Sequence, residues 1–239
     1  MCACRRWERR ESFVGSPRQS RGLHCLRMTA GSGLSRCCQF LSVNGIVERM
    51  SGNRWGAAGP PLEAYSRVTD PERFGSLHRV AAELLDRLER EFDAERAEGY
   101  GLDPELEQGI KLARPSVTLV PRDADAAAPI VVAFSTFPGI VVRLGRWCTS
   151  AFPTCGCDAC DETAEGEIER LKSMIENLTA GRFREAIRIS ADGTPWQEWE
   201  FGSGGGRCAK SRLDPDRARQ LVAAGYRSLY EWGPWPKRR

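Results

Sequence analysis

The stretch IVVAFSTFPGIVVRL, residues 130–144, decides the fold class of this chain. It contains two runs rich in β-branched residues, Ile130–Thr136 and Ile140–Leu144, on either side of Pro138-Gly139, a pair typical of a tight turn. We therefore expect two neighbouring antiparallel strands. Because both runs are almost continuously apolar, each strand should be covered on at least part of both faces.

Further strand signals lie on both sides of this pair. One precedes it at Val117–Val120, and two follow at Phe183–Ile189 and Trp196–Phe201. In the last of these, alternation places Trp199 on one face of the strand and its acidic neighbours on the other. Together the runs predict an antiparallel sheet of about five strands.

Helical patterns separate the strand runs. The first helix should begin at Thr69, where Thr69 and Glu72 match a capping box, and its apolar stripe continues through Phe92 towards Gly99. A second helix is predicted from Thr163 to Thr179, with Asp161 or Thr163 as its cap, and a short third one begins at Asp214-Pro215. The element order is then α-βββ-α-ββ-α, and the fold class is α+β with helices packed on the sheet.

Residues 1–64 differ in composition from the rest. Of these, residues 1–49 carry nine Arg and three acidic residues and five of the ten cysteines, without apolar periodicity. We expect residues 1–64 to be a disordered tail, with translation starting at Met50, and residues 65–239 to form a single α+β domain. The Arg bias of the whole chain, with only four Lys, is what GC-rich codons produce.

Composition also bears on location and partners. No segment offers the roughly 18 consecutive apolar residues of a membrane span, and no early stretch offers the apolar core of about 7 to 15 residues of a secretory signal. We expect no membrane association and a cytoplasmic protein. The basic arm lacks Lys and repeated Arg/Gly patterns, which argues against nucleic acid as a partner.

The stretch FPTCGCDACDE, residues 152–162, is the chemically most informative segment. Together with Cys148 it gives the pattern Cys148-x6-Cys155-Gly-Cys157-x2-Cys160. Zinc favours tetrahedral thiolate sets, and a CxxC turn directs two thiolates at one ion. The candidate zinc ligands are therefore Cys148, Cys155, Cys157 and Cys160. A second CxxC is missing, so the spacing is less specific than that of a paired knuckle.

Two other interpretations of the cysteines remain open. The pair Cys157 and Cys160 could exchange disulfides, because Cys160 precedes a helix, but Asp158, Asp161 and Glu162 nearby would raise a thiol pKa. The cysteines could also be reduced, partly buried thiols that only shape a compact loop.

Residue patterns for catalysis are weak elsewhere. His78 is remote from any nucleophile and should be a boundary residue of the first helix, and a carboxylate pair at Glu198 and Glu200 is explained by strand alternation. We therefore expect a non-catalytic module that binds another protein through an exposed sheet face or through the carboxyl-terminal tail. This tail contains Trp232 and Trp235, which we expect to pack on the domain, although tryptophans of this kind are also frequent at protein interfaces. A thiol-disulfide enzyme is the alternative.

Several segments resemble a bacterial, largely actinobacterial, family of domains of unknown function. They are VTDPERFGSLH, IKLARPSVTLVP, FPGIVVRLGRW, FPTCGCDACDETAEGEIERL and WPKRR, and CGCDACDE is the most specific part. The similarity covers about residues 65–239. It implies membership of a class and no mechanism.

Overall fold

The computed structural model describes residues 54–202, 208–223 and 227–239 of the chain. Residues 1–53, which include the expected start at Met50 and most of the expected tail, lie outside the described residues. The fold class is α+β, as predicted, and the helices and strands follow roughly the expected order. Two antiparallel sheets are present in the described part, where one was expected.

The first sheet is a meander in which each strand pairs with the next one in the chain. The hairpin predicted from residues 130–144 is at its centre, with Val132 opposite Val142 and Phe134 opposite Ile140. The strands are β1 (Ala94–Gly99), β2 (Ser116–Pro121), β3 (Ile130–Phe134), β4 (Ile140–Leu144) and β5 (Cys148–Phe152).

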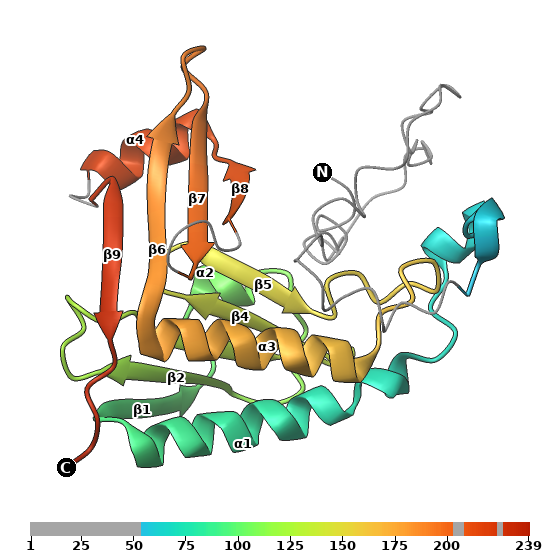
Figure 1. Ribbon diagram of the computed structural model, residues 1–239, viewed down its shortest axis with the longest axis horizontal. Coiled ribbons are helices and arrows are strands. Elements are labelled where there is room, and N and C mark those ends of the chain that lie inside the picture. Colours follow the sequence, from blue (N-terminus) through green and yellow to red (C-terminus); the bar gives the residue numbers. More distant parts are fainter. Residues whose placement is uncertain (1–53, 203–207, 224–226) are drawn as a thin grey trace, which may run out of the picture.

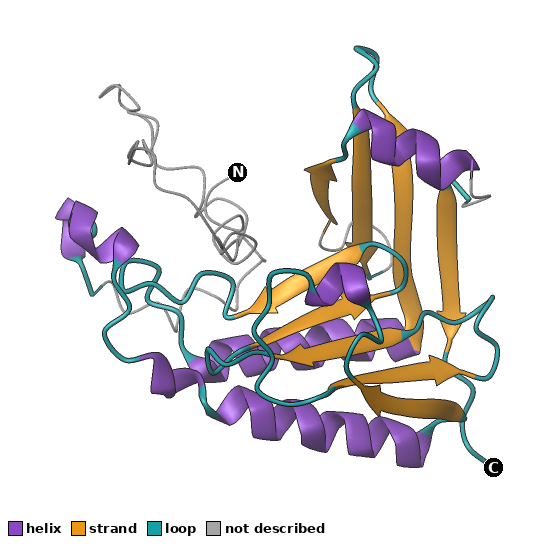
Figure 2. Cartoon of the chain, turned by 180° about the vertical axis from the view of Figure 1, so that it is seen from behind, coloured by secondary structure: helices purple, strands orange, loops and turns teal. Residues whose placement is uncertain are grey.

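Helices cover both faces of this sheet. α1 (Ser76–Glu91) and α3 (Ala164–Thr179) lie side by side on one face (Figure 1). The short α2 (Pro104–Glu107) lies on the other face, where its Leu106 packs with Ala133 and Val141 (Figure 2). The prediction that the two central strands are covered on both faces is therefore confirmed.

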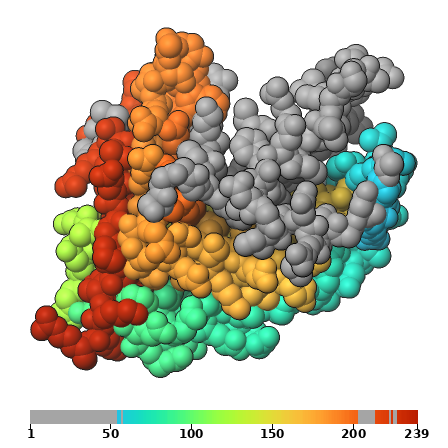
Figure 3. All heavy atoms as spheres, in the orientation of Figure 1, coloured from blue at the N-terminus to red at the C-terminus, as the bar shows by residue number. Residues whose placement is uncertain are grey.

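The second sheet has the strand order β8-β7-β6-β9, and the long β6 follows α3 directly. α4 (Pro215–Ala223) packs on one face of this sheet, where its Leu221 belongs to the same buried cluster as Ile187 of β6 (Figure 2). The space-filling view shows the β6–β7 hairpin projecting from the body of the molecule (Figure 3). The strands are β6 (Ala180–Ile189), β7 (Pro195–Phe201), β8 (Cys208–Arg212) and β9 (Leu229–Pro234).

One hydrophobic core joins the two sheets. Phe183, Trp232 and Trp235 belong to the same buried cluster as Phe134 and Leu171. The tryptophans of the carboxyl-terminal tail therefore pack on the domain, as expected, and the tail adds a strand to it. In the described part of the chain, no helix has both the length and the apolar character needed to cross a membrane.

Glu185 joins the sheets through hydrogen bonds inside this core. Its carboxylate accepts the backbone N–H groups of Arg146 and Trp147, at 2.6 and 2.8 Å, and the indole N–H of Trp232, at 3.0 Å. A side chain at Gly145, which has a φ of 64°, would occupy the place of the Glu185 carboxylate. The turn between β4 and β5 is thereby attached to β6 and β9.

The first helix differs from the expectation at both ends. A 3-10 turn (Pro71–Phe74) precedes α1, and the predicted cap residue Thr69 donates its hydroxyl hydrogen to Asp158 instead. The helix ends at Glu91, well before Gly99, because the following residues pair with β2 as strand β1. By contrast, Thr163 caps α3 as expected, accepting the N–H of Gly166 at 3.2 Å.

The described region also includes residues 54–64, which were expected to belong to the tail. Two 3-10 turns (Gly56–Ala58 and Leu62–Ser66) lie here, and Ala64 is fully buried. The carbonyl oxygen of Ala64 accepts the N–H of Ala159 at 3.2 Å, so this segment packs against the cysteine stretch.

Candidate metal centre

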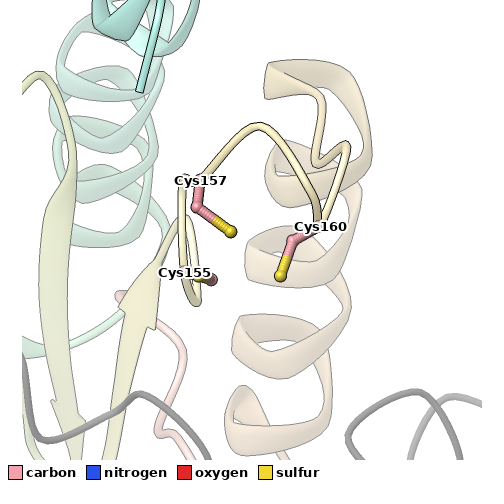
Figure 4. Close-up of side chains that lie close together, drawn as sticks. All are labelled: Cys155, Cys157 and Cys160. Atoms are coloured by element: carbon pink, nitrogen blue, oxygen red, sulfur yellow. The ribbon is translucent and has the colours of Figure 1, made fainter. Parts of the chain in front are cut away.

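Three cysteines come together in the turn between β5 and α3. The sulfur atoms of Cys155, Cys157 and Cys160 all lie within 4.8 Å of one another (Figure 4). Cys157 is buried, Cys155 is half-buried and Cys160 is exposed. Around a zinc ion, with Zn–S bonds of about 2.3 Å, tetrahedral geometry places two sulfurs about 3.8 Å apart. The observed spacing fits three thiolates on one metal ion.

The backbone of the turn is folded around the carboxylate of Glu162. This carboxylate accepts the N–H groups of Cys155 and Gly156 at 2.9 and 2.8 Å. Gly156 has a φ of 72°, and a Cβ at this position would lie about 3 Å from side-chain atoms of Phe137 and Pro153. The glycine of the Cys-Gly-Cys sequence is thus required by both conformation and space.

Asp158 attaches the turn to the segment that precedes α1. Its carboxylate accepts the N–H of Thr69 at 2.9 Å, the Thr69 hydroxyl at 2.6 Å and Nε of Arg67 at 2.8 Å. These hydrogen bonds from Thr69, together with Arg67, hold the pKa of Asp158 well below its usual range. The N–H of Asp158 also donates to the carbonyl of Arg67 at 2.9 Å. The turn and residues 64–69 therefore form one hydrogen-bonded unit.

The three thiols have unequal proton affinities. A hydrogen bond from the Cys160 thiol lowers the pKa of Cys155 to about 6, although burial and the Glu162 carboxylate oppose the change. The same contact with Cys155 raises the pKa of Cys160, and burial raises that of Cys157. The Glu162 carboxylate raises the pKa of Cys155, as expected of an acidic neighbour, but the hydrogen bond from Cys160 lowers it by more.

Cys148, the fourth predicted ligand, lies outside this group of three. It begins β5 opposite Leu144 and is fully buried in the main core. Burial, together with the charge of Glu185, raises the pKa of its thiol well above the usual value. The structure thus brings three of the four predicted ligands together and places the fourth beside the junction of the two sheets.

Asp158 and Glu162 were not singled out as functional from the sequence, and Arg73 was missed too. Arg73 donates to the carbonyl of Gly156 at 3.1 Å. No local pattern identifies the roles of Asp158 and Arg73, because Asp158 lies 89 and 91 positions from Thr69 and Arg67, and Arg73 lies 83 positions from Gly156. A single sequence carries no signal for pairs this far apart.

The other candidate residues have structural partners. Nε2 of His78 lies 2.8 Å from the carbonyl oxygen of Gly139, and its ring packs edge-on against Phe134. Glu198 and Glu200 form ion pairs with Arg188 and Arg184 on the adjacent strand β6. These contacts agree with the expected boundary and strand-face roles.

Comparison with known proteins gives a family without an assigned activity. No curated protein and no solved structure matches the chain. A model described as "Family of unknown function (DUF6226)" matches residues 48–239, which is most of the sequence and the whole of the described fold. The resemblance to a domain family of unknown function is thereby confirmed, and the chain belongs to family DUF6226.

Proposed function

We propose that this chain is a non-catalytic, protein-binding module whose cysteine turn binds zinc through Cys155, Cys157 and Cys160. The observation that carries the proposal is the convergence of three sulfur atoms within 4.8 Å of one another. Thiolates are preferred zinc ligands, and three from one turn form most of a structural site. Cys148, Cys155, Cys157 and Cys160 are all free thiols, which suits a reducing compartment such as the cytoplasm.

The metal stabilises the position of residues 64–69, the segment that precedes α1. Asp158 and Ala159 lie between the proposed ligands, and both hydrogen-bond to residues 64–69. Zinc binding restricts the turn and so favours the conformation in which these bonds form. Because the hydrogen-bonded fold holds the three ligands together, it should bind the metal more tightly than the unfolded chain does, and this difference in binding free energy adds to the stability of the fold.

Partner binding is assigned to the face of the second sheet opposite α4. Trp232 and Trp235 are buried, and their indole N–H groups donate to the Glu185 carboxylate and the Ala128 carbonyl. The two tryptophans therefore stabilise the core and are not available to contact a partner. On the sheet face, Arg184, Arg188 and Leu229 line a shallow hollow together with the two glutamates of β7. Alternating charge with one exposed aliphatic residue suits a protein partner of complementary charge pattern.

Metal analysis of the full chain, purified without added zinc, tests the proposed function. We expect about one zinc ion per chain for the wild type, and substoichiometric zinc for Cys155→Ser, Cys157→Ser and Cys160→Ser. Cys148→Ala is the matched control and should retain the ion. Clearly substoichiometric zinc in the wild type, even after zinc is supplied and excess removed, would contradict the proposal. Loss of zinc in Cys148→Ala would instead make Cys148 a ligand.

The low pKa of Cys155 favours a second function, thiol-disulfide exchange. A thiolate near neutral pH is the attacking species in that chemistry, and Cys160 is in hydrogen-bond contact with Cys155. This alternative requires rapid alkylation of Cys155 in the protein as purified, with half of the maximal rate at about pH 6. Zinc binding predicts slow alkylation that becomes fast only after a chelator is added.

A further inference from the structure

We infer that the zinc ion of this centre keeps one coordination position open and that the position takes an imidazole, the histidine side chain of a partner, from outside the chain. The inference rests on the proposed function, because it concerns the fourth ligand of the same ion. A tetrahedral zinc site has four ligands, and the cysteine turn supplies three.

Two further zinc-type donors in the described part of the chain, Cys148 and His78, have other positions or partners. Cys148 lies in the main core and outside the sulfur cluster. His78 is held at the carbonyl of Gly139. Within the described residues, the only group of cysteine, histidine and acidic side chains spaced for a metal consists of the three turn cysteines.

Each carboxylate of the turn already has a hydrogen-bonding role. Asp158 is bound to Thr69 and Arg67, and Glu162 accepts two backbone N–H groups of the turn. Asp161 forms an ion pair with Arg54 at 3.3 Å. If Asp158 or Glu162 moved to a metal ion, buried or partly buried donors would lose their acceptor, which is unfavourable because water cannot replace it there.

The sulfur cluster is accessible from one side. Cys160 is exposed and Cys155 is half-buried, whereas Cys157 is covered by Ala64 and its neighbours. Figure 4 shows the sulfur of Cys160 facing those of Cys155 and Cys157 across the turn. A ligand from solvent or from a docked protein can therefore approach on the side of Cys160.

Charge favours a neutral ligand at this position. Three thiolates and one Zn²⁺ ion have a net charge of −1, and a fourth anionic ligand would make it −2. The arginines at the turn are engaged, Arg67 with Asp158, Arg54 with Asp161, and Arg73 with the carbonyl of Gly156. A neutral imidazole adds no charge, whereas a thiolate or carboxylate adds a negative charge next to an acidic loop.

Cobalt substitution tests this inference in the full chain. Co²⁺ replaces zinc and reports its ligands through d–d absorption and sulfur-to-metal charge-transfer bands. We expect imidazole to shift the d–d bands in a saturable one-to-one titration without loss of charge-transfer intensity. Acetate should need at least about tenfold higher concentration for the same degree of binding, and a small thiol should not displace bound imidazole at equal concentration.

Two variants separate the possible results. His24→Ala removes the only other histidine of the chain, and the five cysteines of residues 1–49 can be replaced by Ser together with Cys208. If the wild type does not respond to imidazole and either variant does, the chain fills the fourth position itself and the inference is wrong. A wild type and variants that all fail to respond also overturn it. Failure to bind cobalt at all would instead contradict the proposed function.

Discussion

Two buried carboxylates attach distant parts of this molecule, and they do so with different chemistry. Glu185 lies at the junction of the two sheets and accepts uncharged N–H donors from the backbone and from Trp232. Asp158 lies in the cysteine turn and accepts from Thr69 and from the charged Arg67. Burial raises the pKa of Glu185, whereas hydrogen bonds from Thr69 lead the lowering of the pKa of Asp158.

The two carboxylates also differ in how far solvent reaches the groups around them. Glu185 is enclosed by the main core, so its donors have no solvent to replace a lost acceptor. Asp158 is next to Arg67, whose side chain is 58 % exposed, and next to the proposed zinc ligands. Removing the metal or protonating Asp158 should therefore weaken the attachment of the cysteine turn, whereas replacing the Glu185 side chain should weaken the attachment between the two sheets.

The largest effect is expected for Glu185→Ala. The change leaves the N–H groups of Arg146 and Trp147 and the indole of Trp232 without an acceptor in the core. We expect the free energy of unfolding to fall by roughly 3 to 5 kcal/mol. Urea denaturation followed by tryptophan fluorescence measures this loss.

A milder variant keeps this comparison testable if Glu185→Ala does not fold. Trp232→Phe removes one donor to Glu185 and retains an aromatic ring, and should cost about 1–3 kcal/mol. Losses below about 0.5 kcal/mol for both variants, the size of an ordinary surface change, would show that Glu185 does not hold the sheets together.

Local patterns predicted the three longer helices and five of the strands in the described part, but not the division into two sheets. The apolar runs of β3 and β4 and the cap at Thr163 were identifiable, because strand propensity and capping are short-range properties. β1, β5, β8 and β9 were missed. AERAEG in β1 has little apolar character, and β1 and β5 are strands because they pair with β2 and β4. The pairing of β6 with β9 joins segments far apart in the chain, which no local pattern encodes.

The candidate site was predictable only as a set of cysteines. The spacing of Cys155, Cys157 and Cys160 indicated a tight turn, and their sulfur atoms do converge. Nothing in that spacing distinguishes Cys148, which is close in sequence but belongs to a strand and points into the core. The partners of Asp158 come from the segment before α1, so the attachment of the turn depends on tertiary structure.

An intermediate effect, with a distinct pH dependence, is expected for Asp158→Asn. The pKa of Asp158 is lower in the folded chain than the unfolded value of about 3.9, so ionised Asp158 stabilises the fold above that value. This contribution is lost as the pH falls through about 4 towards the folded pKa. Thermal unfolding of metal-free wild type and variant should therefore differ clearly at pH 7 and converge at acid pH. A difference independent of pH would mean that charge at Asp158 is unimportant.

The smallest effect is expected for Glu198→Gln, the matched control on the second sheet. Glu198 pairs with Arg188 across β6 and β7 at 2.6 Å, but the arginine side chain is 59 % exposed. Such pairs contribute about 0 to 1 kcal/mol, because water and salt compete for both charges. The urea midpoint should hardly move, and the small change should vanish at high salt.

Partner binding through this face predicts that the same substitution weakens association. A stability loss approaching that of Glu185→Ala would instead make the Arg–Glu pairs part of the framework, and the contrast between sheet junction and sheet surface would fail.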